Sequence, residues 1–353
     1  MQDVNWAVLA AATLMVLFLS QACLVLTSIL HLANVKGGTW REDITPYAHK
    51  IFYLFPLAAA MMAVLLMFPE KTFPYYGKTV AHMSPWLNYS FLVTREAVMM
   101  LLVAATGFGY IRASDRHRRE FTAKTRDMLT YFSSAVITLY VLYATVVSWD
   151  FEMTLTMHWH SAIYSAYFFV SSFGMFLAFF VVSMYILRVT TKGTRGISDK
   201  SFNALAQLML GFTLLWTYTF FSQFLTIWYA ALPGETKRLF ALMFENADIR
   251  RGPSEISVFF WTFVLFKSFG PFFMLIFSVF RHTPALTAFV GLIILTGTFL
   301  ERFTWAAATY KAWNTPLSGL FDIVVVAGVV AIMFAVLRHG YYRAASLNPV
   351  KNT

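Results

Sequence analysis

Long apolar runs dominate this sequence, and short polar stretches separate each run from the next. A helix needs about 20 mostly apolar residues to cross the hydrocarbon core of a bilayer. Nine runs come close to that length or exceed it, and no run alternates in the manner of a strand. The predicted membrane-spanning helices cover residues 6–32, 47–68, 88–111, 127–148, 161–187, 203–230, 255–280, 284–300 and 317–337.

The composition agrees with a polytopic membrane protein. Hydrophobic residues make up 59% of the 353 and charged residues only 12%, whereas soluble domains carry about 25% charged residues. The 37 Phe, 17 Tyr and 10 Trp suit aromatic belts at both membrane interfaces. The single cysteine, Cys23, excludes an internal disulfide. We therefore expect an all-α polytopic membrane protein, with residues 1–353 forming a single transmembrane helical domain in the lipid bilayer.

The distribution of Lys and Arg predicts the orientation of the chain. The net charge is +10, but the basic residues lie in short loops, so they indicate topology rather than a nucleic-acid partner. Seventeen of the 27 fall on one side of the predicted bundle, and eight fall on the other. By the positive-inside rule, the N-terminus lies outside and the C-terminus inside. Residues 149–160 are then an external loop without Lys or Arg.

A few polar residues interrupt the predicted spans, mostly in their outer halves. They are Arg95 and Glu96 in the third span, Gln223 in the sixth, Lys267 near the middle of the seventh and Asp322 in the ninth. A charge at the bilayer centre costs ~2.5–3.5 kcal/mol even on lenient scales. Groups retained at that cost are expected to pair with one another and to line an interior, hydrated path. Glu301 and Arg302, at the end of the eighth span, are expected to be solvated at the interface.

The stretch SWDFEMTLTMHWHSAIYSAYFF, residues 148–169, brings further ionisable groups to the same outer level. It contains Asp150, Glu152, His158 and His160 within eleven residues. The two histidines could make structural hydrogen bonds, exchange protons or contact a quinone. Zinc and haem sites are not favoured, because the available histidines border loops and lack matched ligands at one depth. We predict no metal site and no catalytic residue in this chain.

Two of the intramembrane charges leave alternatives open. Arg95 could form a structural ion pair between helices, and since adjacent residues point about 100° apart on a helix, Arg95 and Glu96 should reach different partners. Lys267 has no short route to water, so it should be functional or tightly paired. Glu96 and Asp322 are candidate partners for its ammonium group.

Four stretches resemble one family of membrane subunits. FFSQFLTIWYAALPGETKRLF, WDFEMTLTMHWHSAIYSAYFF, NYSFLVTREAV and FKSFGPFFML are similar to motifs of the ActF-type subunit of bacterial alternative complex III, within the wider NrfD/PsrC-like group. The matches lie in order over roughly residues 85–310. Lys267 departs from the family, in which a histidine is expected ahead of the Pro-Phe motif.

The resemblance implies a role in a respiratory chain. Such complexes oxidise menaquinol or ubiquinol in the bacterial inner membrane and pass electrons to a periplasmic acceptor. An ActC-type membrane subunit, an iron–sulfur subunit and multihaem cytochrome c subunits are the implied partners, and they hold the haem c groups and iron–sulfur clusters. The ActF-type chain is implied to supply scaffold and a proton path. Arg95, Glu96, Asp150, His158, His160, Gln223, Lys267 and Asp322 are the predicted proton-path or quinone-proximal residues.

A secondary transporter coupled to ions or protons is the alternative function. Transporters also carry polar sites at the midplane, usually with interrupted helices and an internal repeat. Gly270 and Pro271 could break the seventh span, but no convincing repeat occurs in the sequence.

Overall fold

The computed structural model describes residues 5–33, 40–77, 85–156, 159–191, 196–230, 233–244, 255–307 and 320–347. Its regular secondary structure in these ranges is entirely helical. Nine helical stretches of the described chain are long and apolar enough to cross a membrane. They are residues 6–32, 42–67, 89–119, 123–153, 164–190, 199–230, 256–276, 284–307 and 322–342. Each matches one predicted span, so the prediction of an all-α fold with about nine helices of membrane-spanning length and apolarity is confirmed for the described residues.

The helices follow one another along the chain with short connections. Their bounds are α1 (Trp6–Leu32), α2 (Trp40–Ile51), η1 (Phe52–Leu54), α3 (Phe55–Met67), α4 (Pro69–Thr72), α5 (Tyr89–Arg119), α6 (Ala123–Ser148), η3 (Trp149–Met153), α7 (Tyr164–Thr190), α8 (Asp199–Ala230), α9 (Pro233–Met243), α10 (Glu255–Val264), η6 (Leu265–Phe269), α11 (Gly270–Ile276), α12 (Ser278–His282), α13 (Pro284–Ala307) and α14 (Leu320–Leu347). Here η1 is a short 3₁₀ turn, whereas η3 and η6 are π-helical.

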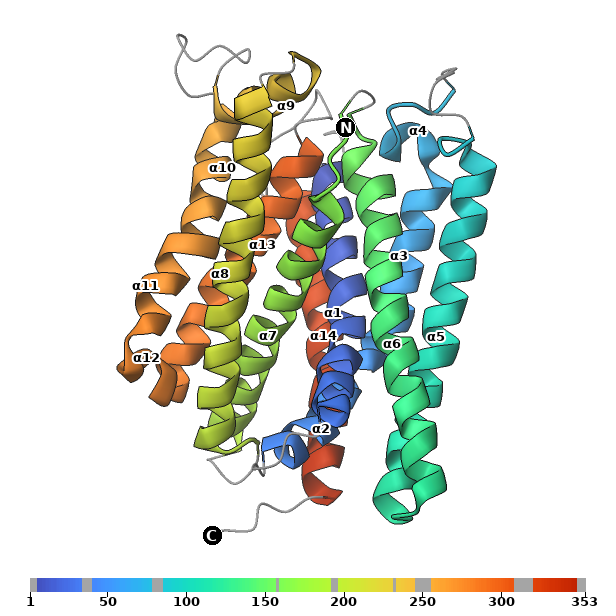
Figure 1. Cartoon of the computed structure of the whole chain (residues 1–353), viewed down its shortest axis with the longest axis vertical. Coiled ribbons are helices and arrows are strands. Elements are labelled where there is room, and N and C mark those ends of the chain that lie inside the picture. Colours follow the sequence, from blue (N-terminus) through green and yellow to red (C-terminus); the bar gives the residue numbers. More distant parts are fainter. Residues whose placement is uncertain are drawn as a thin grey trace.

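Helix α1 forms the centre of the molecule, as Figure 1 shows. It is apolar on all sides and buried over nearly its whole length, which is the pattern of a helix surrounded by protein. It packs against α6, α7 and α13, with the α5–α6 pair on one side and α8 with α10–α12 on the other. The N-terminus lies at the upper end of the view in Figure 1 and the C-terminus at the lower end.

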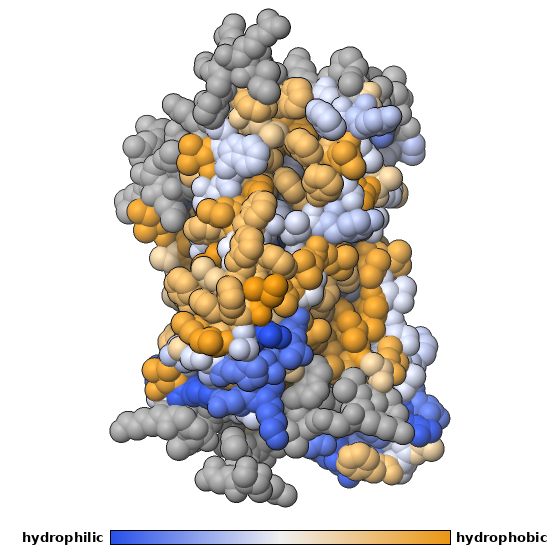
Figure 2. Space-filling model, turned by 60° about the vertical axis from the view of Figure 1, so that its left-hand side comes forward, coloured by the Kyte–Doolittle hydropathy of each residue, from blue (hydrophilic) through white to orange (hydrophobic). Residues whose placement is uncertain are grey.

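The surface agrees with a protein that sits in a bilayer. On the face that it shows, Figure 2 has mostly apolar side chains across the middle of the molecule and a hydrophilic patch towards the lower end. The last turn of α5 carries Arg116, His117, Arg118 and Arg119, and it lies at that lower end. The positive-inside rule therefore still predicts that the lower end faces the inner side.

Both π-helical segments carry charged residues that matter below. Segment η3 extends α6 and buries Asp150 and Glu152, so the prediction that residues 149–153 belong to an external loop was wrong. Segment η6 joins α10 to α11 and buries Lys267. A π-helical turn widens the backbone spiral by one residue, and such turns occur often at functional sites.

Candidate functional site

Arg95 and Asp150 form the first of three buried ion pairs. The Arg95 guanidinium on α5 donates from Nε and Nη2 to the two carboxylate oxygens of Asp150, over 2.7 and 2.5 Å. Its Nη1 donates to the Trp86 carbonyl oxygen over 2.9 Å, and the Trp86 indole donates to Asp150. Two-pronged pairing of this kind is the strongest geometry that an arginine offers a carboxylate. The pair ties α5 to η3.

Glu96 lies next to this pair without sharing the arginine. Its side chain is fully buried, and in the described part of the chain neither carboxyl oxygen has a hydrogen-bond partner. Arg95 therefore pairs with Asp150 and not with the adjacent Glu96. The Tyr143 hydroxyl lies beside the Glu96 carboxyl, but at a geometry that makes no regular hydrogen bond.

The second pair joins Lys267 on η6 to Glu301 on α13. The ammonium donates to Glu301 Oε2 over 2.8 Å and to the Ser171 hydroxyl over 2.6 Å. Ser171 donates to the same carboxylate oxygen, and the Trp216 indole donates to the other over 3.0 Å. The partner of Lys267 is thus Glu301, and neither Glu96 nor Asp322, the candidates from the sequence, takes that place.

A glycine on α13 allows Lys267 to reach this position. Gly297 lies one turn before Glu301, and a Cβ added there would come within 2.9 Å of both Lys267 Cγ and Phe266 Cβ. The absence of a side chain lets the stem of the lysine lie directly against α13. The ammonium group then arrives at the carboxylate of the next turn.

The third pair joins Arg302 to Glu152. Arg302 Nη1 donates to both carboxylate oxygens of Glu152 over 2.8 Å, and Nη2 donates to the Ser172 hydroxyl over 3.2 Å. The Tyr164 hydroxyl donates to Glu152 over 2.5 Å. Glu301 and Arg302 are 0% and 2% exposed, so the expectation that they are solvated at the interface was wrong. Helix α13 continues to Ala307 and covers both side chains with another turn.

Arg238 on α9 closes the upper side of this arrangement. Its guanidinium donates to the carbonyl oxygens of Glu152 and Met153, and it stacks over the rings of Trp159 and Trp305 at 4.3 and 5.0 Å. Burial lowers the pKa of Arg238 to about 10, so the group remains a cation at neutral pH.

Replacing Arg238 with lysine should therefore lower stability by about 1–3 kcal/mol. Lysine keeps the charge but loses the planar fork that bonds two carbonyl oxygens and stacks on the indole rings. Thermal unfolding of the purified protein, with the exposed Lys200→Arg variant as the matched control, measures this loss. An unchanged unfolding temperature in Arg238→Lys would show that charge alone suffices there.

Together these groups form what we call the buried ionic network. It consists of the cationic side chains Arg95, Arg238, Lys267 and Arg302 and the acidic side chains Glu96, Asp150, Glu152 and Glu301. Asp150, Glu301 and Glu152 each neutralise a cationic partner, as expected at a site from which water is largely excluded. The three pairs are close to one another along the chain. Asp150 and Glu152, two residues apart on η3, belong to the first and third pairs, and the adjacent Glu301 and Arg302 belong to the second and third.

Of the other predicted site residues, those that the structure describes do not join the network. His158 lies outside the described residues, and His160 is exposed. Gln223 is buried on α8, but among described residues no hydrogen bond joins it to the network. Asp322 at the start of α14 accepts a hydrogen bond of 3.4 Å from the Asn5 amide. No group of three or more His, Cys, Asp and Glu positioned to hold a metal ion occurs in the described ranges.

Comparison with known proteins gives no assignment. No protein-family model matches the chain, and no curated protein matches it. The chemistry of the site therefore rests on its geometry. It holds charges in direct contact inside a membrane bundle, and protons can pass between such groups along their hydrogen bonds.

Proposed function

We propose that this chain is an integral membrane subunit of a quinol:electron-acceptor oxidoreductase of the alternative complex III type. In this proposal it contributes membrane scaffold and a proton-conducting path that is coupled to quinol oxidation by the complex. Its partners are an ActC-type membrane subunit, an iron–sulfur subunit and multihaem cytochrome c subunits. The location is the bacterial inner membrane, with menaquinol or ubiquinol as the electron donor.

The observation that carries the proposal is the buried ionic network. Several paired charges at one level of a membrane bundle are costly, and such groups commonly mark proton or ion pathways. The pair of Lys267 and Glu301 is bridged by Ser171, so the ammonium, hydroxyl and carboxylate form a closed set of hydrogen bonds. A proton can move within that set without any large motion of the helices.

The motif stretches supply most of this network, which supports the link to the family. Residues 88–98 contribute Arg95 and Glu96, and residues 149–169 contribute Asp150 and Glu152. The later stretches contribute Arg238 and Lys267. The resemblance and the buried charges therefore coincide at the same positions of the chain.

A coupled secondary transporter is the second candidate, and one observation favours it. Helices α10 and α11 are interrupted by the π-helical segment η6, which Gly270 and Pro271 follow directly. Interrupted helices at a buried charge are typical of transporter binding sites. Lys267 lies within the interruption.

Purification from native membranes in a mild detergent separates the two candidates. The proposal predicts that a tagged chain co-purifies with c-type haem absorption and with the electron paramagnetic resonance signals of iron–sulfur clusters. An unrelated tagged membrane protein from the same membranes is the control for carry-over. A colourless chain isolated alone would contradict the oxidoreductase assignment and favour transport.

Replacing Asp150 with asparagine should lower the rate of quinol oxidation by at least about tenfold. One positioned proton-transfer group usually contributes a factor of about 10² to 10⁴ to a rate. The complex should stay assembled, because the amide keeps the shape of Asp150 and the neighbouring Glu96 carboxyl can release its proton and balance the charge of Arg95. Quinol-dependent reduction of the acceptor, measured on gel-filtered complex, tests this. Normal turnover in an assembled Asp150→Asn complex would count against a role for this carboxylate.

A further inference from the structure

A line of buried polar side chains begins at Glu96 of the network and continues below it, between α1, α5, α6 and the α2–η1 junction. In the described part of the chain, each contains a buried polar atom without a hydrogen-bond partner. They are the Glu96 carboxyl oxygens, the Tyr143 and Tyr140 hydroxyls, the Gln21 amide oxygen and Nε2 of His49. Buried polar groups in proteins nearly always have a partner, and where protein supplies none, ordered water does.

These groups follow one another along the bundle. On α5, residues 96, 103, 107 and 110 recur at helical spacing and therefore share a face. At about 1.5 Å per residue, Tyr110 lies about 21 Å below Glu96. The His49 ring contacts the Tyr110 ring there, with centroids 5.4 Å apart. The set therefore spans most of the thickness of a bilayer core, which is about 30 Å.

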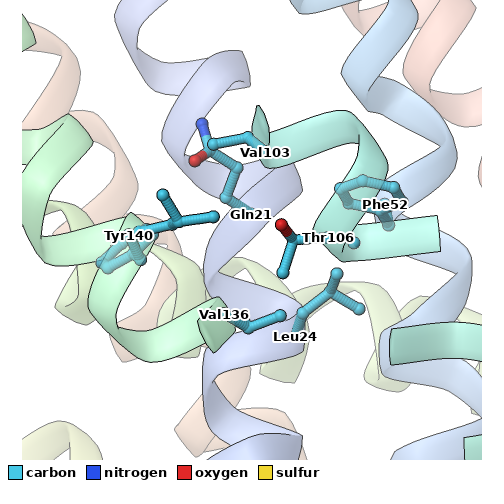
Figure 3. A pocket seen from close by; sticks show the side chains of 9 residues that line it. Gln21, Leu24, Phe52, Val103, Thr106, Val136 and Tyr140 are labelled. Carbon is cyan, nitrogen blue, oxygen red and sulfur yellow. The ribbon is translucent and has the colours of Figure 1, made fainter. Parts of the chain in front are cut away.

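A cavity lies beside residues 103–107 of α5, between Glu96 and Tyr110, and Figure 3 shows side chains that line it. Its lining comes from α1, η1, α5 and α6, and consists of Gln21, Leu24, Phe52, Val103, Thr106, Gly107, Val136, Leu139 and Tyr140. The volume that the centre of a water molecule can occupy in this cavity is about 20 Å³. The cavity can therefore hold one or two waters and is far too small for a quinone. The Gln21 amide and the hydroxyls of Thr106 and Tyr140 offer such waters several polar partners.

Glu96 is the upper end of this line and carries an exchangeable proton. The Arg95 guanidinium is committed to both oxygens of Asp150, so in the described part of the chain the neighbouring Glu96 carboxyl makes no ion pair of its own. The titratable groups that face it are Asp150 and Arg95 of that ion pair and the Tyr143 and Tyr75 hydroxyls. Burial raises the pKa of Tyr75, so this hydroxyl is neutral. An unpaired carboxyl in these surroundings favours its neutral, protonated form.

Phe52 forms the lower boundary of the cavity. A Cβ added to Gly107 would lie 2.3 Å from Phe52 Cζ, so only a glycine allows the ring to rest against the backbone of α5. Phe52 lies one turn after His49 on the same chain segment. Since Phe52 lies against Gly107 and His49 lies against Tyr110, the Phe52 ring lies between the cavity and His49 at the levels that α5 defines.

We propose that Glu96 is a proton-exchange site supplied from the lower end of the bundle by a water-lined path. The path runs past His49 and the Phe52 ring, and along Gln21 and Tyr140 to the carboxyl group. This inference builds on the proposed proton path, but its test needs no quinol turnover. The failure of one proposal can therefore be told apart from the failure of the other.

Infrared spectroscopy of the purified protein in its native assembly tests the path. A protonated carboxylic acid has its own C=O stretching band, which shifts when the proton is replaced by deuterium. We expect Glu96→Gln to remove one such band. After a jump into D₂O, we expect Gln21→Met to slow the shift of the Glu96 band at least tenfold, because methionine keeps the length of the side chain but removes its amide.

Two further variants make the outcome decisive. Tyr140→Phe removes only a hydroxyl and should slow the exchange as well, so the test does not depend on the folding of one variant. Thr94→Val removes an exposed hydroxyl of α5 that lies off the path and should leave the rate unchanged. If Glu96→Gln removes no band, Glu96 is ionised and the proposal fails. If neither cavity variant slows the exchange, the proton arrives by another route.

Discussion

Replacing Arg95 with leucine is expected to prevent stable assembly of the chain in the membrane. The substitution leaves Asp150 fully buried with the Trp86 indole as its remaining donor, beside the unpaired carboxyl of Glu96. Breaking a buried pair by removing one partner costs ~3–5 kcal/mol, which is a large part of the 5–15 kcal/mol by which most proteins are stable. The amount of folded protein in detergent extracts, measured by fluorescence-detected gel filtration, should fall severalfold.

A double variant distinguishes the ion pair from the packing of the arginine. Arg95→Leu combined with Asp150→Leu removes both charges, and replacing a whole buried pair with apolar groups is often neutral. The double variant should therefore recover most of the folded protein that the single variant loses. Normal yield and stability of Arg95→Leu alone would mean that water, not Arg95, satisfies Asp150.

Replacing Glu301 with leucine is expected to have an effect of similar size. The change removes the acceptor of Lys267, Ser171 and Trp216 together, and it leaves the ammonium group buried beside the Arg302 cation. An uncompensated buried charge again costs ~3–5 kcal/mol. Thermal unfolding in detergent should show a strongly lowered midpoint or no folded protein at all.

The control is the double variant Lys267→Met with Glu301→Leu. Methionine keeps the length of the lysine stem against Gly297, and leucine fills the place of the carboxylate with apolar atoms. Folding should recover, since no unpaired charge remains in the pocket. If Glu301→Leu alone were as stable as the double variant, Lys267 would have a second partner that replaces Glu301.

The membrane spans were predictable because their signal is local. A helix in lipid must be apolar over its whole length, so each span appears as one run in the sequence. The ends were harder to place. The eighth span was predicted to end at residue 300, but α13 continues to Ala307, because its last turns bury Glu301 and Arg302 against charges from other helices. By hydropathy alone, Glu301 and Arg302 look like the end of the membrane span. Their ion pairs with Lys267 and Glu152 make them part of the protein interior instead.

Most partners within the site were not predictable for the same reason. Lys267 and Asp150 could be recognised as candidate site residues, since each is a charged residue within or next to a long apolar segment. Which helix faces which is a property of packing, so Glu301 could not be matched to Lys267 from one sequence. Nothing local marked Arg238, which looks like an ordinary loop cation until α9 folds it over η3. The π-helical turns at η3 and η6 also leave no simple periodic signal.

The measurement that tests the central claim most directly is the ratio of protons moved to electrons transferred. The native complex and the complex carrying Lys267→Met with Glu301→Leu would be reconstituted in sealed vesicles and driven with quinol. Our account predicts that the double variant still transfers electrons, while its proton-to-electron ratio falls clearly below that of the native complex. An unaltered ratio in a fully assembled double variant would show that the buried ionic network is structural and carries no protons.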